Sequence, residues 1–271
     1  MATSVHSRLP CFGGDLESAA EAVVARAQAR GGGYVTLANV HLLMVALRDE
    51  RVLDALRHSR MVFPDGAPVA RLLRRQMPQA RRVSGPDLLP AVFKLGARDG
   101  LRHFLYGSDE TTLERLVGAL HSIAPAASIV GTYAPPMTRG DEFEPGRSLE
   151  SIRLVEPHIV WCGLGAPKQE LFMHAYSDRL FPSLLIGVGA AFDFIAGNKQ
   201  RAPMWMREHS LEWLYRFAGE PRRLGPRYLS TNGQFLLRAA SSRVRGGQRG
   251  ELLGQAVHPV APQRRRSSNS Q

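Results

Sequence analysis

The chain has 271 residues, 44% of them hydrophobic, which is long and apolar enough for one large globular domain or for a domain with an appendage. Its two cysteines, Cys11 and Cys162, lie far apart, which excludes a disulfide framework and a cysteine-based zinc or redox motif. Residues 1–10 have no apolar core, so we expect no signal peptide. The longest apolar run, residues 184–192, is too short to span a bilayer, and we expect a protein of the reducing cytoplasm.

The formal net charge of +11 is distributed unevenly. Residues 201–271 contain 13 Arg and 4 acidic residues, a net charge of +9, whereas residues 1–200 are nearly neutral. A basic end of this kind suits an anionic membrane surface, a phosphorylated ligand or nucleic acid, or is simply a solvated tail. We predict an α/β core over residues 1–200, a helical, membrane-proximal appendage over 201–240 and a disordered basic tail over 241–271.

Strand and helix patterns alternate along the core. Asp15 can cap a first helix, and three glycines at 31–33 end it. Alternation of this type is typical of a parallel sheet with helices on both faces, a Rossmann-like α/β fold. The predicted strands are 34–37, 61–63, 103–107, 128–131, 159–162 and 184–189, and the predicted helices are 16–27, 40–47, 52–57, 67–76, 88–97, 111–120, 148–156 and one from Pro167.

Ligands of such sheets bind beyond the carboxyl ends of the strands. Eight residues follow predicted strand ends, and we expect them to line one crevice: Thr36, Asn39, Asp65, Gly107, Gly131, Gly163, Gly165 and Gly189.

The stretch 159–170 (IVWCGLGAPKQE) reads as a buried strand, a glycine turn and a helix start. Gly163 and Gly165 allow a ligand to approach the main chain, and Pro167 suits the first helical turn. Free N–H groups and the positive end of the helix dipole meet there, so the turn can seat a phosphate, with Lys168 adding a charge and Gln169 an amide. The alternative is a tight turn that binds no ligand.

Asp65 lies between Pro64 and Gly66, directly after a predicted strand. One positioned carboxylate can take a proton from an attacking hydroxyl, although the spacing alone favours an ordinary turn or helix-cap residue. The sequence contains no Asp-x-Asp pair and no His/Cys cluster at zinc spacing, so we expect no metal and no organic cofactor; basic groups and helix ends would then neutralise a diphosphate. His41 and His174 lie in helical stretches and read as ordinary helix residues.

Residues 201–238 combine tryptophans and leucines with arginines, a composition that fits binding at a membrane interface or packing of a helical hairpin on the sheet.

Several segments together resemble the WecG/TagA/CpsF family, glycosyltransferase family 26. The resemblance runs in order through roughly residues 10–238, and one departure is the pair Leu37-Ala38, where many relatives have a single residue. The matching segments are 36–41 (TLANVH), 63–66 (FPDG), 82–88 (RVSGPDL), 163–170 (GLGAPKQE), 187–194 (GVGAAFDF), 201–203 (RAP), 211–214 (LEWL), 220–224 (EPRRL) and 227–229 (RYL).

The resemblance implies a fold of the GT-E type and an inverting, metal-independent transfer of N-acetylmannosamine, its uronic acid or a related hexose. The donor would be a UDP-sugar and the acceptor a polyprenyl-diphosphate-linked saccharide at the cytoplasmic membrane surface, in cell-surface polysaccharide biosynthesis. Nucleic acid is not an expected partner, and a homo-oligomer is compatible with the sequence.

The resemblance also implies roles for residues. Asp65 would be the general base, and Thr36, Asn39 and Gln169 would position the sugar and the acceptor. Arg82 would lie near phosphates and Asp193 near the uracil. The site would be completed by the turn residues Gly107, Gly131, Gly163, Gly165, Gly189, Pro167 and Lys168. Arginines of the basic end would close over the diphosphate: Arg216, Arg222, Arg223 and Arg227.

Two other functions compete with this one. A nucleotide-dependent oxidoreductase would use the same type of sheet, but no G-x-G-x-x-G follows the first predicted strand and no acidic residue is placed to bind a ribose. A nucleic-acid-binding protein would use the basic end, but the arginines of the tail are not interleaved with base-stacking aromatics. Titration with UDP, NAD and a short DNA separates the three.

Overall fold

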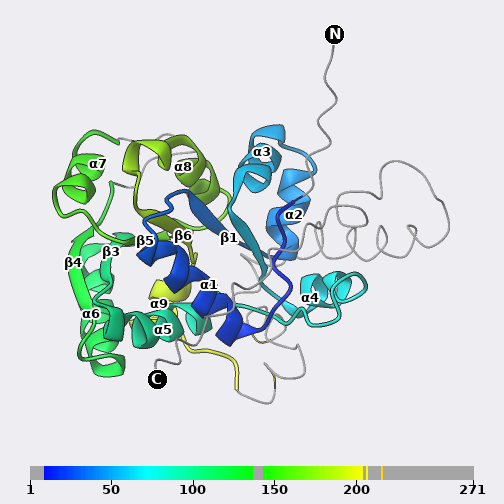
Figure 1. The fold of residues 1–271 in the computed structure, drawn as a ribbon, viewed down its shortest axis with the longest axis horizontal. Helices are drawn as coiled ribbons and strands as arrows, with labels where there is room; N and C mark the ends of the chain where they lie inside the picture. The colour runs from blue at the N-terminus through cyan, green and yellow to red at the C-terminus, as the bar shows by residue number, and fades with distance from the viewer. Residues whose placement is uncertain (1–8, 137–142, 144, 204–205, 207–214, 216–271) are drawn as a thin grey trace, which may run out of the picture.

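The computed structural model describes residues 9–136, 143, 145–203, 206 and 215. Its centre is a six-stranded sheet in which every neighbouring pair of strands is parallel, in the order β2-β1-β6-β5-β3-β4. The predicted α/β architecture is thus confirmed (Figure 1). The strands are β1 (Tyr34–Ala38), β2 (Met61–Pro64), β3 (Arg102–Gly107), β4 (Ser128–Tyr133), β5 (Ile159–Gly163) and β6 (Leu184–Gly187).

Helices cover both faces of the sheet. One face is packed by α1 (Leu16–Gln28), α5 (Gly85–Gly96), α6 (Glu110–Ile123) and α9 (Ala191–Ile195). The other is packed by α2 (Val40–Ala46), α3 (Glu50–His58), α4 (Ala67–Leu73), α7 (Pro145–Leu154) and α8 (Lys168–Tyr176). Two short 3₁₀ turns, η1 (Ala97–Asp99) and η2 (Asp178–Leu180), complete the elements.

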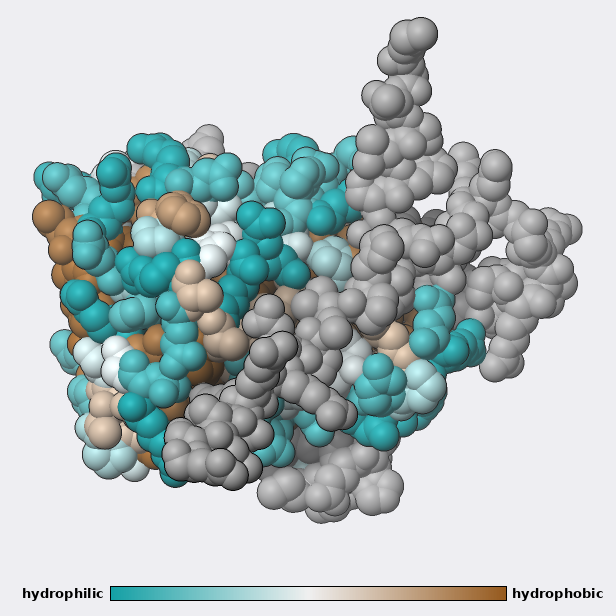
Figure 2. All heavy atoms as spheres, viewed as in Figure 1, coloured by the Kyte–Doolittle hydropathy of each residue, from teal (hydrophilic) through white to brown (hydrophobic). Residues whose placement is uncertain are grey.

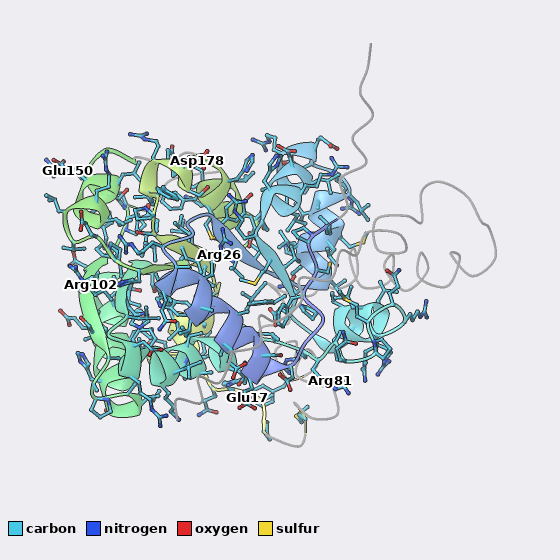
Figure 3. The ribbon with its side chains drawn as sticks, viewed as in Figure 1. Glu17, Arg26, Arg81, Arg102, Glu150 and Asp178 are labelled. Carbon is cyan, nitrogen blue, oxygen red and sulfur yellow. The ribbon has the colours of Figure 1, made fainter. Side chains whose placement is uncertain are left out.

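The first helix illustrates how local sequence sets these elements. The Asp15 side chain accepts a hydrogen bond from the Ser18 backbone N–H, and the Asp15 backbone N–H donates in return to the Ser18 hydroxyl, so two N–H groups at the start of the helix are satisfied. Arg26, near the other end of α1, donates to the carbonyls of Gly31 and Gly32 at 2.7 and 3.0 Å (Figure 3). These contacts fix the turn that leads into β1.

Alternating side chains of the strands fill the two helix layers, as the pleat of a strand requires. Trp161 in β5 is fully buried on the α1/α5 side, where its indole N–H donates to Nδ1 of His103 at 3.2 Å. The His103 ring stacks on Phe93 at 4.0 Å, and burial lowers the pKa of His103 to about 3, so this histidine is a neutral core residue.

Several predicted bounds need correction, and one helix was not predicted. Helix α5 begins at Gly85, three residues early, because Pro86 fits a first helical turn. Helix α4 ends at Leu73, β6 ends at Gly187, and α9 follows it unpredicted. A five-residue helix is too short for its period to stand out in the sequence.

The visible face in Figure 2 is largely hydrophilic, with hydrophobic residues gathered along the left edge, where Figure 1 places β4 and α7. Leu154 at the end of α7 is 78% exposed. Within the described part of the chain, no helix combines the length and the apolar character that crossing a membrane would require.

Candidate active site at the carboxyl ends of the strands

Asn39 and Asp65 lie side by side at one end of the sheet. Ala38 and Pro64 are register partners at the ends of β1 and β2, and the next residue along each strand is one of this pair. The Asp65 backbone N–H donates to the Ala38 carbonyl at 3.0 Å. Asn39 caps α2 by accepting from the Leu42 N–H at 3.1 Å, as the sequence predicts. The polar side chains therefore meet where two parallel strands end.

Gly66 determines how the chain leaves Asp65. Its φ of +115° lies in a region that side chains disfavour, and α4 begins at the next residue. Asp65 is only partly buried, so the residue on this tight turn stays partly exposed to solvent. This is the placement that a general base needs.

The segment that carries Arg82 runs beside the end of β2. The Val83 N–H donates to the Pro64 carbonyl at 2.9 Å, which places Arg82 next to the Asp65 turn. The Arg82 guanidinium lies 3.4 Å from the carboxylate of Asp87, in the first turn of α5.

Asp87 joins this segment to a distant part of the chain. It accepts from the Ser84 hydroxyl at 2.5 Å and pairs with Nη1 of Arg201 at 2.8 Å. Burial alone would raise the pKa of Asp87, but the hydrogen bonds from Arg201 and Ser84 hold it below its usual value. The carboxylate is therefore charged, and it fixes two arginines, Arg82 and Arg201, near the start of α5.

Arg201 keeps donors that this contact does not use. Its Nε and Nη2 atoms are buried and have no hydrogen-bond partner among the residues that the structure describes. A buried guanidinium N–H without a partner is unfavourable, so an anionic ligand at this point would be stabilised.

The glycine turn after β5 has the predicted form. Gly165 has a φ of +80°, and a Cβ atom at this position would meet no other atom within 4 Å, so the main chain is open to a ligand. Pro167 caps α8 instead of lying inside its first turn. Lys168 lies over the ring of Phe143, 5.7 Å from its centre, at the start of that helix.

Gln169 connects the start of α8 with the turn that follows β6. It is only 3% exposed, and its side-chain oxygen accepts the Gly189 N–H at 2.9 Å. Its NH₂ group donates to Glu170 at 2.9 Å. Both ends of the amide are thus engaged inside the protein, and Gln169 holds the turn after β6 against the start of α8.

Glu170 is fully buried, and its second carboxylate oxygen, Oε2, has no hydrogen-bond partner among the described residues. Desolvation raises its pKa to about 7, although the hydrogen bond from Gln169 opposes the shift. A carboxyl group whose pKa is higher in the folded than in the unfolded state stabilises the fold at low pH and loses this contribution as pH rises toward the folded value.

We therefore expect Glu170→Gln to remove a pH dependence. The wild-type free energy of unfolding should fall by up to about 3 kcal/mol between pH 4.5 and 8 through this group, at 1.36 kcal/mol per pKa unit. The variant keeps the oxygen that Gln169 needs, so it should match the wild type at pH 4.5 and exceed it at pH 8. Urea unfolding across this range measures the difference, and parallel pH profiles would contradict the assignment.

Two predicted site residues lie inside strands instead of beyond them, which corrects the expectation that they follow strand ends. Thr36 is in the middle of β1, fully buried, with its hydroxyl 2.8 Å from that of Ser59. Gly131 lies within β4, where a side chain would collide with the Phe104 ring. β4 continues two residues past its predicted end, whereas Thr36 already lies inside the predicted strand 34–37.

Three other predicted residues stand at the expected edge. Gly107 and Gly163 end β3 and β5 as register partners, and a side chain on Gly107 would strike the Gly163 backbone. Asp193 lies in the first turn of α9 and pairs with Lys199 at 2.9 Å.

Four predicted arginines lie outside the described residues: Arg216, Arg222, Arg223 and Arg227. Three members of the network lie inside segments that resemble the family but were given no role from the sequence: Asp87, Glu170 and Arg201.

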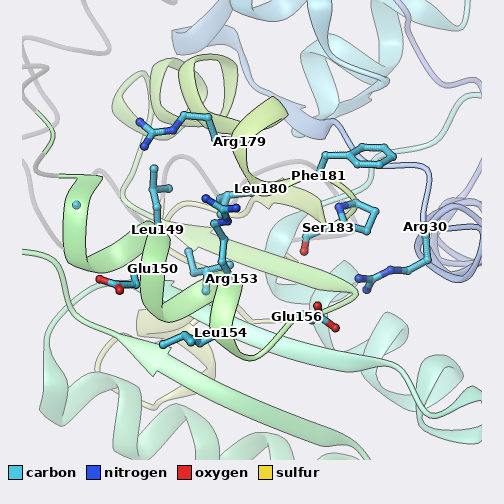
Figure 4. A pocket seen from close by; sticks show the side chains of 13 residues that line it. Arg30, Leu149, Glu150, Arg153, Leu154, Glu156, Arg179, Leu180, Phe181 and Ser183 are labelled. Carbon is cyan, nitrogen blue, oxygen red and sulfur yellow. The ribbon is translucent and has the colours of Figure 1, made fainter.

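A cavity of about 610 Å³ lies elsewhere, beside α7 and the segment that precedes β6 (Figure 4). It is lined by Arg30, Arg153, Arg179 and Phe181 among others, all from segments that lead into the amino ends of strands. None of the predicted site residues lines this cavity; they lie toward the opposite end of the sheet.

Comparison with known proteins identifies the family of this chain. Residues 8–249 match the model of the Glycosyl transferase WecG/TagA/CpsF family. The chain is 32% identical over 196 residues to the N-acetylglucosaminyldiphosphoundecaprenol N-acetyl-beta-D-mannosaminyltransferase of Bacillus subtilis (strain 168), covering 71% of this chain and 73% of that protein. The chain therefore belongs to the WecG/TagA/CpsF family of glycosyltransferases and is a hexosyltransferase.

Proposed function

We propose that this protein transfers N-acetylmannosamine, its uronic acid or a related hexose from a UDP-sugar to a polyprenyl-diphosphate-linked saccharide, in cell-surface polysaccharide biosynthesis. The name of the Bacillus relative, which specifies both a mannosaminyl group and a diphosphoundecaprenol acceptor, supports the substrate classes. Because such an acceptor is anchored in a bilayer, the enzyme would work at the inner face of the cytoplasmic membrane, bound peripherally through its basic end.

The observation that carries the mechanism is the partly exposed Asp65 beside Asn39, close to the arginine-bearing segment 82–87. In the proposed step, Asp65 takes the proton of an acceptor hydroxyl while that oxygen attacks the anomeric carbon of the donor. The bond from this carbon to the UDP oxygen breaks, and UDP leaves with the electron pair. Attack from the face opposite to UDP inverts the configuration, and Asn39 would orient the sugar or the acceptor.

The departing diphosphate gains negative charge, which the site must stabilise. Arg82, next to the Asp65 turn, and Arg201 are both fixed by Asp87 and would supply cations. The main chain at Gly165 would let a phosphate approach on the other side of the site, beside Lys168 at the start of α8. Gln169 contributes by holding the Gly189 turn in place, and thereby positions the site.

We propose that no metal takes part, because the crevice carboxylate nearest to the arginines, Asp87, is already engaged by Arg82 and Arg201. The expected result is that UDP binds with the same affinity in the presence and absence of EDTA. Isothermal titration with UDP, with Mg²⁺ or EDTA added, measures this. A loss of affinity on chelation would contradict metal independence while leaving the transferase assignment intact.

NAD serves as the negative control for the competing oxidoreductase function. Membership of a transferase family favours the transferase, and we expect NAD to bind far more weakly than UDP. Mass spectrometry of a donor screen against a lipid-diphosphate saccharide acceptor would identify the transferred sugar.

A further inference from the structure

Three metal-binding side chains that are dispersed in the sequence meet on the surface between α3 and α8. Asp54 and His58 belong to α3 and His174 belongs to α8, two helices that lie side by side in Figure 1. One potential ligand atom from each residue lies within 4.8 Å of the other two. The sequence was searched only for a His/Cys cluster at zinc spacing, and spacing along the chain does not reveal residues that meet from separate helices.

Hydrogen bonds fix the ring nitrogen that His174 presents. The Tyr34 hydroxyl donates to the Ala55 carbonyl at 2.6 Å, so toward His174 Nδ1, 3.0 Å away, it can only accept. His174 Nδ1 therefore carries a proton, and in the neutral ring Nε2 has a lone pair. Hydrogen bonding of the remote nitrogen is the usual way in which proteins orient a metal-binding histidine.

The lone pair of Nε2 faces a carboxylate. Oδ2 of Asp54 lies 3.4 Å from Nε2 of His174, and its other oxygen, Oδ1, lies 3.4 Å from Nδ1 of His58. With the ring neutral, a metal ion between the two atoms would stabilise this arrangement; with Nε2 protonated, the two side chains would instead form an ion pair. Zinc ligands at about 2.0–2.1 Å from a tetrahedral ion are separated by about 3.3 Å, which matches the observed spacing.

His58 can complete the set. Its Nδ1 lies 2.9 Å from the Asp54 backbone carbonyl, to which it can only donate, so the lone pair is on Nε2. Its ring centre is 5.2 Å from that of His174, and the side chain is 61% exposed, so it can turn toward an ion without disturbing the core.

There is also space for an ion beside these side chains. A cavity of about 330 Å³ lies against Asp54 and His174 and would admit the ion with a water as the fourth ligand. Arg51 also lines this cavity, but its guanidinium is paired with Asp49 at 2.8 Å.

We infer that Asp54, His58 and His174 form a site for Zn²⁺ or a similar divalent transition metal that clamps α3 to α8. The site lies near the amino ends of the strands, because Tyr34 begins β1 and α3 leads into β2. It is therefore separate from the crevice, and its ion would hold the far end of the helix whose first turn carries Lys168 and Gln169.

The test uses the full chain without a histidine tag, freed of metal and then titrated with ZnCl₂. We expect one zinc ion per chain in the wild type, at least about tenfold weaker binding in Asp54→Asn and His58→Ala, and no change in His121→Ala, an exposed histidine on α6. Zinc should raise the thermal midpoint of the wild type and of His121→Ala only. Cobalt should give the visible absorption of a tetrahedral complex.

Equal zinc affinity in the wild type and His58→Ala would overturn the site, and so would an equal loss in His121→Ala, which would indicate general binding to surface histidines. The metal-free midpoint of each variant shows that it folds. UDP affinity provides a separate readout, since removal of this zinc should lower the midpoint and leave UDP binding unchanged.

Discussion

Asp65→Asn should lower turnover by about 10²–10⁴-fold, the usual contribution of a general base. The substitution keeps the size and shape of the side chain on the turn between β2 and α4 and removes only its ability to take a proton. Affinity for UDP should stay close to that of the wild type, because the proposed contacts to the diphosphate come from other residues. Steady-state transfer to a soluble acceptor analogue, together with UDP titration, measures both quantities.

A matched control is Asp109→Asn. Asp109 also follows a strand end, but its carboxylate caps α6 by accepting the Thr112 N–H at 2.8 Å, and asparagine caps helices equally well. Turnover of this variant should be unchanged. Near-normal turnover of Asp65→Asn, or an equal loss in Asp109→Asn, would show that Asp65 is not the base.

Removal of the basic end should abolish transfer even where no membrane is needed. We propose that some of Arg216, Arg222, Arg223 and Arg227 reach the diphosphate, since arginine offers bidentate, charge-assisted hydrogen bonds that a closed site requires. Loss of a single such donor commonly costs about 10²–10³-fold in turnover, so loss of several should leave no measurable activity. Membrane attraction alone would supply only about 1 kcal/mol per residue and would weaken with salt.

The structure indicates where the chain can be truncated without disturbing the described core. A chain that ends at Pro203 keeps the Arg201–Asp87 pair and the buried side chain of Ala202, so the described core should keep its thermal midpoint. A chain that ends at Ser242 is the control and should remain active. Activity of the shorter chain on a soluble acceptor would show that the basic end serves only to hold the enzyme at the membrane.

The positions of several candidate residues could be predicted because their signals are local. Asn39, Asp65, Gly165 and Lys168 each follow a recognisable strand, and in a parallel sheet the carboxyl ends of strands share one edge. Gly131 was misplaced because strand boundaries are hard to predict. An apolar run shows that a strand exists, but hydrogen bonds to its neighbours decide where it ends.

Local sequence was sufficient to establish the alternation of elements, the parallel sheet and the edge at which the candidate residues lie, because hydrophobic periodicity and turn residues act within a few positions of each other. Three long-range contacts became evident only once the chain was folded: Gln169 reaches Gly189, Arg201 reaches Asp87, and His174 lies beside Asp54. These contacts depend on the strand order and on the direction of each side chain, which arise when the whole core packs and leave no mark in the local pattern.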